Sequence, residues 1–405
     1  MTQIAYLCSQ YPAVSHTFIN REIEQVEAAG VKVHPFSMRP GKVLDGGTDF
    51  EKSQLKDTWC IHQQSIFTKI MSPLLQFLGS PVGYLRGMFY AIALQKGHPR
   101  DSLWAIFHFL EAAMMVREMK KRGLNHVHVH FAGSEAAIAL YAHKAFGIHY
   151  SFTLHGPDVF FKVESGHLAE KLKHAAFVVC ISHFARGQAL RLAGIQAWDK
   201  LPIVRCGVDP NRYAPVRRTE SFEQRPFNIV CTGRLTPTKG QALLILSCAQ
   251  LAKEGLNFQC TLIGGGDDYD TLQQMVKDHN LQDKVTLTGS LPQDGVLERL
   301  QKADLFVLPT FAEGVPVVLM EAMSMEIPCI STRVAGIAEL IENNENGWLI
   351  HSGNPDALTQ QLRTLINNPG PLDEAGKQAR ETVIQRYNIA TNGRRIADIY
   401  KERLN

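Results

Sequence analysis

The sequence predicts a protein of two α/β domains, each built on a parallel sheet covered by helices. Short apolar runs alternate with amphipathic, helix-like stretches almost throughout the chain, a pattern typical of parallel sheets with covering helices. The chain has 405 residues, more than one ordinary hydrophobic core holds, so two domains are expected. The alternation stops at residues 207–226, which contain Pro210, Pro215 and Pro226, and it restarts after them.

The first domain is predicted to comprise residues 1–206. Its expected strands are residues 4–8, 31–36, 126–131, 150–154, 177–181 and 203–205, and its clearest helices are residues 18–29 and 135–146. Residues 61–123 depart from the pattern, because aromatic and apolar residues are dense there and lysines and arginines lie among them. We favour helices packed on the sheet, since interior amphipathic helices are the commoner case. An amphipathic insertion that faces a membrane or a lipid-linked acceptor is kept as the alternative.

Residues 207–226 are predicted to be a linker and residues 227–385 the second domain. The expected strands of this domain are residues 228–232, 259–263, 285–288, 305–308 and 329–331. Its expected helices are residues 241–254, 272–279, 295–302, 315–325 and 355–366. Residues 373–404 are expected to be helical, and residues 386–405 to form a helix that crosses back to the first domain.

Composition excludes several classes of protein. Hydrophobic residues make up 45% of the chain and charged residues 20%, as in a folded globular protein. The net charge of +3 is too small for a dedicated nucleic-acid-binding surface, so no nucleic acid partner is expected. The eight cysteines form no C-x-x-C pair, which favours buried thiols in a reducing cytosol. Because we find no signal-like N-terminus and no run of about 18 apolar residues, we expect a cytoplasmic protein, with peripheral attachment to the inner face of the cell membrane left open.

The most informative motif is E-G-x-P-x(4)-E, which begins at Glu313 and ends at Glu321. It follows the expected strand 305–308, and Pro316 suits the start of a helix. Amides at a helix start favour an anion, and ligands bind at the carboxyl edge of open α/β sheets. Each carboxylate has two acceptor oxygens, which suits the hydroxyls of a ribose or a hexose. A helix-capping glutamate and a surface glutamate would give the same pattern.

A second motif, G-R-x(4)-K-G, comprises Gly233, Arg234, Lys239 and Gly240 between a strand and a helix. Arginine grips two phosphate oxygens at once and lysine adds a point charge, so this loop suits a diphosphate. The two cations would also neutralise a diphosphate leaving group without a metal. A basic surface turn is the alternative interpretation.

Two further clusters belong to the first domain. The motif H-G-x-D runs from His155 to Asp158 after an expected strand, although a lone histidine is usually structural. Ser15, His16 and Thr17 lie between the first strand and the first helix. A helix cap explains Ser15 or Thr17 as well as a ligand contact does.

Two patterns invite other functions. His126, His128 and His130 share one face of an expected strand, but no cysteine or carboxylate partner is evident to complete a zinc site, so no metal is predicted. The run of glycines at 264–266 lacks the G-x-G-x-x-G spacing of a dinucleotide fingerprint, so it is interpreted as a tight turn. A nicotinamide oxidoreductase is therefore the weakest alternative.

Taken in order, H-G-x-D, G-R-x(4)-K-G and E-G-x-P-x(4)-E resemble the motifs of glycosyltransferase family 4, whose members are retaining enzymes of GT-B fold. The resemblance covers nearly the whole chain, including residues 206–213, and residues 11–18 and 313–323 look closest to the bacterial exopolysaccharide and colanic-acid branch. It implies two Rossmann-like domains whose parallel sheets face each other across a cleft. Many relatives have a Gly-Gly loop after the first strand, whereas this chain has Ser9-Gln10-Tyr11-Pro12, which favours acceptor recognition there.

The resemblance implies a role for each motif. Arg234 and Lys239 would bind the donor diphosphate, Glu321 the ribose, Glu313 the donor sugar, and His155 would orient the reacting centre. The implied catalytic residues are His155, Glu313, Arg234 and Lys239, and the implied donor site comprises Gly233, Arg234, Lys239, Gly264, Gly289, Leu291, Glu313, Gly314, Val315, Pro316 and Glu321. The acceptor-side candidates are Ser15, His16, Thr17 and Asp158, and no cofactor or metal is implied.

The predicted reaction moves a sugar from a nucleoside diphosphate sugar, with UDP favoured over GDP, to a saccharide or lipid-linked saccharide in cell-surface or exopolysaccharide biosynthesis. The acceptor hydroxyl would attack from the face that the diphosphate leaves, and a leaving phosphate oxygen would take the proton. Two alternatives remain. A GT-B epimerase would convert the nucleotide sugar without an acceptor, and a non-catalytic nucleotide-sugar-binding protein would bind the donor without turnover.

Overall fold

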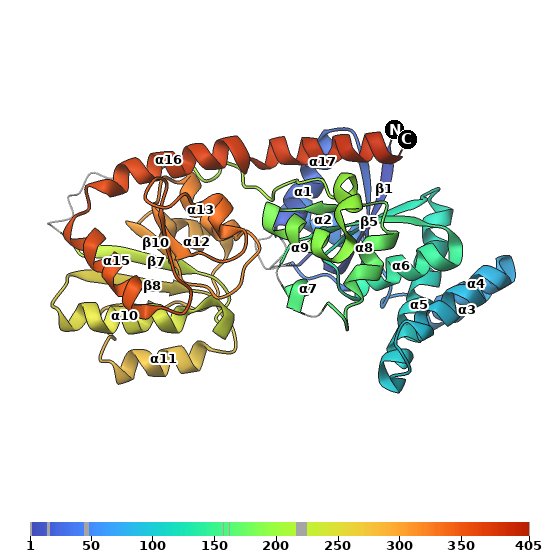
Figure 1. Ribbon diagram of the computed structural model, residues 1–405, viewed down its shortest axis with the longest axis horizontal. Helices are drawn as coiled ribbons and strands as arrows, with labels where there is room; N and C mark the ends of the chain where they lie inside the picture. The colour runs from blue at the N-terminus through green and yellow to red at the C-terminus, as the bar shows by residue number, and fades with distance from the viewer. Residues whose placement is uncertain are drawn as a thin grey trace. The chain divides into compact units, whose positions relative to one another are not determined.

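The computed structural model describes residues 2–13, 17–43, 48–156, 158–161, 163–215 and 225–404. The chain divides into two compact units (Figure 1). Unit 1 comprises Met1–Val204 and Thr391–Asn405, and unit 2 comprises Arg205–Ala390. Each unit holds one six-stranded sheet in which every strand pairing is parallel, so the predicted α/β class is confirmed.

The sheet of unit 1 has the strand order β3-β2-β1-β4-β5-β6. Its strands are β1 (Gln3–Tyr11), β2 (Lys32–Pro40), β3 (Trp59–Cys60), β4 (His126–His130), β5 (His149–Leu154) and β6 (Phe177–Cys180). The chain order reverses between β1 and β4, so this pair marks the topological switch point, where open α/β sheets bind ligands at the carboxyl ends of the strands.

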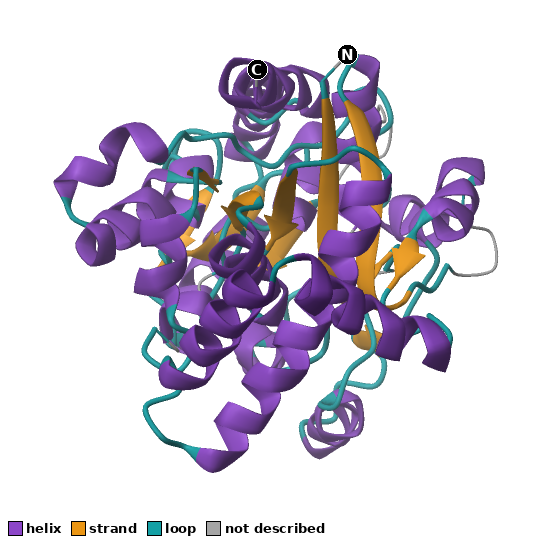
Figure 2. Ribbon diagram, turned by 90° about the vertical axis from the view of Figure 1, so that its right-hand side faces the viewer, coloured by secondary structure: helices purple, strands orange, loops and turns teal. Residues whose placement is uncertain are grey.

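Helices cover both faces of this sheet (Figure 2). They are α1 (Thr17–Ala28), α2 (Asp49–Asp57), α3 (Ile66–Gly79), α4 (Pro81–Ala93), α5 (Pro99–Lys121), α6 (Ser134–Phe146), α7 (Asp158–Phe161), α8 (Leu168–His174), α9 (His183–Ala193) and the unit 1 part of α17 (Ile389–Leu404). Successive residues of β1 point to opposite faces. Leu7 belongs to the core cluster that includes α5 and α6, and Tyr6 to the cluster that includes α1 and α17.

The sheet of unit 2 has the order β12-β11-β10-β7-β8-β9, with the switch point between β10 and β7. Its strands are β7 (Phe227–Thr232), β8 (Phe258–Ile263), β9 (Val285–Leu287), β10 (Leu305–Leu308), β11 (Cys329–Thr332) and β12 (Trp348–Ile350). Its helices are α10 (Gln241–Lys253), α11 (Tyr269–Asp278), α12 (Gln293–Leu300), α13 (Val317–Ser324), α14 (Ile337–Leu340), α15 (Pro355–Asn367) and α16 (Pro371–Arg386).

The structure corrects the sequence prediction in a few places. The strand expected at residues 203–205 is wrong, because Ile203 makes only one isolated bridge with Cys180 before the chain leaves the sheet. The short strands β3 and β12 were not predicted. The helix expected at 373–404 is two helices, α16 and α17, separated at Tyr387 and Asn388. There Asn388 Oδ1 accepts a hydrogen bond from the Ala390 amide at 3.0 Å and so starts α17.

The three histidines of β4 lie in a buried polar layer beneath α1 and α17. His126 and His128 each lie 2.8 Å from Ser151 Oγ, and His128 also lies 2.8 Å from Thr153 Oγ1. In the same layer, the hydroxyls of Tyr6 and Tyr400 lie 2.7 Å apart. These hydrogen bonds offset the cost of burying polar groups and join α17 to the sheet.

This buried layer makes the stability of unit 1 depend on pH. Burial lowers the pKa of His126 to about 3, and burial with neighbouring histidines lowers the pKa of His128 well below its usual value. The unfolded chain therefore binds protons that the folded chain does not, so stability present above pH ~6.5 is lost as pH falls toward 3. Burial raises the pKa of Glu22 to about 7, and this carboxyl acts in the opposite direction between pH ~4.5 and 7.

We predict that His126→Gln reduces the acid sensitivity of unit 1. Below pH 6 the free energy of unfolding should fall by about 1.4 kcal/mol less per pH unit than in the unaltered chain, the amount for one proton. Urea unfolding between pH 7.5 and 5.0 measures this slope. His98→Gln, at an exposed histidine of the same unit, is the control and should leave the slope unchanged. Equal slopes for all three proteins would show that His126 does not carry the effect.

Candidate functional site

The carboxyl edge of the unit 2 sheet brings together the loops that follow its central strands. The loop after β7 pairs with the loop after β8, because the Gly233 amide donates to Ile263 O and the Leu235 amide to Gly265 O, both at 3.0 Å. The loop after β8 also meets the loop after β9, since the Gly264 amide donates to Gly289 O at 3.0 Å. The predicted donor residues Gly233, Gly264 and Gly289 therefore lie in adjacent loops.

Two glycines permit these close approaches. Gly264 has a φ of +148°, and a Cβ there would lie 1.9 Å from Gly233 O. Gly240 has a φ of +71°, and a Cβ there would lie 2.0 Å from Pro309 O, in the loop after β10. Any larger residue at either position would push neighbouring loops apart. Gly240 thus holds the β7 and β10 loops together at the switch point.

An ion pair joins the same two loops. Lys239 ends the short 3-10 helix of residues Pro237–Lys239 after β7, and Glu313 lies in the loop after β10. The Lys239 ammonium contacts Glu313 Oε1, with side-chain exposures of 21% and 13%. Solvent screens a pair this sheltered less than it screens a surface pair. Two of the four predicted catalytic side chains are therefore in direct contact.

Arg234 lies in the same β7 loop and its side chain is exposed. Gln241 Nε2 donates to the Arg234 carbonyl at 3.0 Å, which fixes the backbone. Within the described residues no ion pair or hydrogen bond engages the Arg234 guanidinium. Its cation is thus available at the edge where Lys239 and Glu313 meet.

The loop after β10 leads into α13, which begins at Val317 rather than at Val315 as predicted. Pro316 is the cap residue, since it lacks an N–H and has an extended φ/ψ of −70° and 124°. No side chain caps the helix, so the first amides of α13 give the loop a partial positive charge. The loop itself is anchored by Gly314 O, which accepts from the Gly336 amide at 3.0 Å.

Glu321 lies one turn inside α13 and is 8% exposed. The Tyr213 hydroxyl donates to Glu321 Oε1 at 2.8 Å, and Gln293 Nε2 donates to the same hydroxyl at 2.8 Å. Ser324 Oγ donates to Tyr213 O at 3.0 Å. This role of Tyr213 was not predicted from the sequence, although the resemblance to the family includes residues 206–213. The remaining predicted donor residue, Leu291, lies two positions before Gln293, between β9 and α12.

The first-domain candidates belong to unit 1. His155 follows β5 and is 8% exposed. Its Nε2 lies 2.8 Å from His130 Nδ1, and its ring contacts Phe18 and Phe131 at centroid distances of 4.7 and 4.9 Å. Ser15 and His16 lie outside the described residues. Thr17 begins α1 and Asp158 begins α7, and the description of these two residues extends to the backbone only.

A carboxylate partner for the β4 histidines does exist, contrary to the prediction from sequence. In the described residues Glu22, His128 and His130 place ligand atoms within 4.8 Å of one another. The Tyr6 hydroxyl donates to Glu22 at 3.0 Å, and both ring nitrogens of His128 lie 2.8 Å from hydroxyl oxygens. A metal would have to displace bonds that these groups already make. Sequence reasoning missed Glu22 because it lies on α1, far from β4 along the chain.

Comparison with known families accounts for both units. The model described as Glycosyltransferase Family 4 matches residues 88–212, and the model described as Glycosyl transferases group 1 matches residues 215–382. The second match contains the Lys239–Glu313 pair and Glu321. Together the two models cover most of both units, as the resemblance predicted.

Curated relatives match over part of their length. The chain is 34% identical over 208 residues to the putative colanic acid biosynthesis glycosyltransferase WcaL of Escherichia coli (strain K12), covering 50% of this chain and 51% of the relative. It is also 34% identical over 207 residues to the amylovoran biosynthesis glycosyltransferase AmsK of Erwinia amylovora, covering 50% of each. The chain thus matches about half the length of these relatives.

Solved structures share the whole fold. Sucrose-phosphate synthase from Thermosynechococcus elongatus superposes with a TM-score of 0.77 at 18% identity, covering 99% of each chain. HepE of Anabaena in complex with UDP-glucose superposes with a TM-score of 0.73 at 17% identity, covering 99% of this chain and 100% of that one. The two family matches identify a Glycosyltransferase Family 4 domain and a Glycosyl transferases group 1 domain in this chain, and its two parallel-sheet units share the GT-B fold of these neighbours.

Proposed function

We propose that this chain is a retaining, metal-independent glycosyltransferase that uses a nucleoside diphosphate sugar, UDP-linked rather than GDP-linked. Its acceptor is a saccharide or lipid-linked saccharide in cell-surface or exopolysaccharide biosynthesis. The observation that carries the proposal is the Lys239–Glu313 contact across the switch point, with Arg234 exposed beside it. The names of two relatives, a putative colanic acid biosynthesis glycosyltransferase and an amylovoran biosynthesis glycosyltransferase, and the UDP-glucose in the HepE complex support it.

Unit 2 would bind the donor. Arg234 and Lys239 hold the diphosphate, with the amides of Gly314 and Val315 near it. Tyr213 positions the Glu321 carboxylate, which accepts the ribose hydroxyls. The base lies along the loops that contain Gly264, Gly289 and Leu291.

The ion pair gives Lys239 and Glu313 a coupled role. A diphosphate carries more negative charge than a carboxylate, so it competes with Glu313 for the Lys239 ammonium. Glu313 then turns to the hydroxyls of the donor sugar. One binding event thereby creates the phosphate contact and the sugar contact together.

The positive charges that bind the diphosphate also assist transfer of the sugar. The bond between the sugar carbon and the diphosphate oxygen breaks while the acceptor hydroxyl forms a bond to that carbon from the same face. Arg234, Lys239 and the start of α13 stabilise the departing diphosphate in place of a metal. The acceptor proton passes to a phosphate oxygen, and His155 in unit 1 orients the reacting centre.

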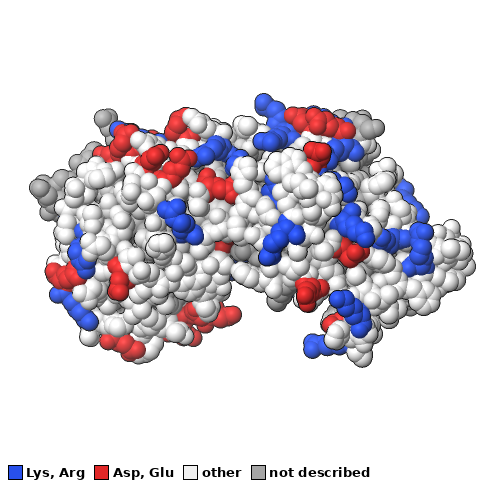
Figure 3. Space-filling model, viewed as in Figure 1, with Lys and Arg blue, Asp and Glu red and all other residues white. Residues whose placement is uncertain are grey.

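Contact with a membrane is a further part of the proposal. Exposed apolar side chains line the outer faces of α3 and α4, namely Ile66, Phe67, Ile70, Leu74, Leu78, Val82, Leu85 and Phe89. Residues 58–100 contain no aspartate or glutamate but four lysines and arginines. Figure 3 has the same view as Figure 1. At the position of α3 and α4 it shows mainly white, uncharged residues, with blue lysines and arginines beside them. Such a face suits an anionic bilayer surface. In the described residues no helix is long and apolar enough to cross a membrane.

We predict that the purified chain transfers label from a tritiated UDP-sugar to a lipid extract, and that Lys239→Ala abolishes most of this activity. Loss of a charge-assisted contact should weaken UDP-glucose binding about 10- to 100-fold by calorimetry. Lys253→Ala, at the exposed far end of α10, is the matched control and should bind as the unaltered chain does. Conversion of the nucleotide sugar without acceptor would indicate an epimerase, and binding without turnover a non-catalytic protein.

We predict that Glu313→Gln separates binding from transfer. Removing the competing charge leaves Lys239 to the diphosphate, so UDP affinity should rise about two- to fivefold. The transfer rate should fall by at least about tenfold, because the amide is a weaker acceptor for the donor sugar. Calorimetry with UDP and the radiolabel assay measure the two effects. Weaker UDP binding in this variant would contradict the competition between Glu313 and phosphate.

We predict that Phe67→Glu weakens binding to vesicles that contain phosphatidylglycerol by about tenfold, the cost of removing a buried aromatic side chain from lipid. Cosedimentation measures the bound fraction. Phe67 is 73% exposed, and Ile195→Glu at a residue 72% exposed elsewhere in unit 1 is the matched control. Equal binding of the two variants, or self-association through this face in sedimentation velocity, would refute the membrane contact.

A further inference from the structure

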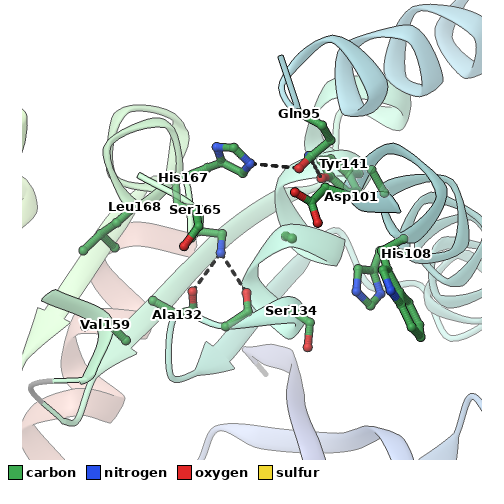
Figure 4. Close-up of a pocket in the computed structure, with 16 residues that line it drawn as sticks. Gln95, Asp101, His108, Ala132, Ser134, Tyr141, Val159, Ser165, His167 and Leu168 are labelled. Carbon is green, nitrogen blue, oxygen red and sulfur yellow. Dashed lines mark hydrogen bonds between the residues drawn. The ribbon is translucent and has the colours of Figure 1, made fainter. Parts of the chain in front are cut away.

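Unit 1 contains a cavity of about 420 Å³ that the donor chemistry does not use (Figure 4). Its wall comes from α5, from the turn between β4 and α6, and from the loop between α7 and α8. A volume of this order is typical of pockets for small ligands, which range over about 300–1,000 Å³. The cavity therefore has room for a sugar ring with its substituents.

The place of the cavity in the fold also indicates a ligand. Ala132, Gly133 and Ser134 line it, and they follow β4 directly. Strand β4 pairs with β1 at the switch point of the unit 1 sheet. Ligands of open α/β sheets bind outside the carboxyl ends of the strands at that point.

One side of the cavity is aromatic. Trp104 lines the wall from α5 and is 55% exposed. Its ring stacks on that of His108, with centroids 6.1 Å apart and planes inclined by 28°. A flat, partly exposed indole suits the apolar C–H face of a pyranose, since such a ring presents hydroxyls at its edge and carbon-bound hydrogens on its face.

The other side presents hydrogen-bonding groups. His167 Nε2 lies 3.1 Å from Gln95 Oε1, and Gln95 Nε2 donates to the Tyr141 hydroxyl at 3.3 Å. These three side chains meet at one edge of the cavity, and Asp101 lies beside them (Figure 4). Amide, imidazole, phenol and carboxylate groups bind hydroxyls in both donor and acceptor roles.

The charges of the wall disfavour an anion. Among the described lining residues Lys171 is the sole lysine or arginine, and it is 3% exposed. Its ammonium donates to Ala132 O and Gly133 O at 2.8 Å each. Burial lowers its pKa to about 8. Its hydrogen bonds therefore hold the β4–α6 turn, and Asp101 adds negative charge to the wall. A phosphate would meet no exposed cation here.

We infer that this cavity binds a neutral pyranose of the acceptor, with Trp104 against the face of the ring and Asp101 and Gln95 at its hydroxyls. That the bound sugar belongs to the acceptor rests on the proposed function. That the cavity binds a pyranose rests on the cavity alone. It assigns the sugar-binding role to α5 and the β4–α6 turn rather than to residues 15–17.

The test compares two neighbouring residues of α5. Trp104 and Leu103 are 55% and 54% exposed, but only Trp104 lines the cavity. Methyl glycosides of glucose, galactose and mannose serve as probes in saturation-transfer NMR, with UDP as a separate probe of unit 2. Trp104→Ala should raise the Kd of the bound glycoside at least about tenfold, while Trp104→Phe stays within about threefold. Leu103→Ala should match the unaltered chain, and UDP binding should be the same in all four proteins.

Several results would overturn the inference. They are absence of glycoside binding to the unaltered chain, equal losses in Trp104→Ala and Leu103→Ala, and displacement of the glycoside by inorganic phosphate. An unchanged acceptor KM in Trp104→Ala during sugar transfer would also overturn it, while leaving the proposed function in place. Glycoside binding that depends on Trp104, in a chain that neither binds UDP nor transfers sugar, would uphold the cavity and defeat the proposed function.

Discussion

The approach of the β7 and β10 loops at the switch point of unit 2 is the constraint on which the candidate donor site depends. The two loops can approach this closely because residue 240 is a glycine, since a Cβ there would lie 2.0 Å from Pro309 O. Thr310 Oγ1 and the Phe311 amide both bond to Thr238 O, at 2.9 and 2.7 Å, and so fix the same contact. Lys239 and Glu313 meet because their loops are already held together. Their ion pair is a consequence of the loop geometry as much as a cause of it.

The two switch points use different chemistry. In unit 2 the edge is cationic, with Arg234, Lys239 and the uncapped start of α13. In unit 1 the corresponding edge carries His155 bonded to His130, and a cavity in which Lys171, the one lysine among the described lining residues, is engaged by backbone carbonyls. Under the proposed function, the diphosphate would bind to unit 2 rather than to unit 1. This difference in charge is the reason for proposing that the charged substrate and the neutral one bind to different units.

Sequence patterns located the strands next to the site well, because these strands are mainly apolar runs that end at loops rich in glycine and proline. Strand β10 has the predicted bounds Leu305–Leu308, while β3 and β12, of two and three residues, were missed. The donor motifs could be found because glycine, proline and charged residues fall at fixed spacings within single loops. Their roles in catalysis remain proposals, since spacing along the chain does not give the distances between side chains.

Contacts between distant segments are what the sequence could not supply. Tyr213 and Glu321 are 108 positions apart, and Glu22 reaches the histidines of β4 from α1. The wall of the unit 1 cavity is a second example, in which the sequence of α5 alone does not show which side chains line the cavity. The buried side of α5 comprises Ala105, Phe109, Ala112 and Val116, and this side sets the direction of every other residue of the helix. Trp104 and His108 then face the cavity, and Leu103 and Phe107 lie one residue back on the exposed face. Composition alone shows that residues 61–123 are apolar and basic, but only the packing of α5 distinguishes Trp104, which lines the cavity, from Leu103, which does not.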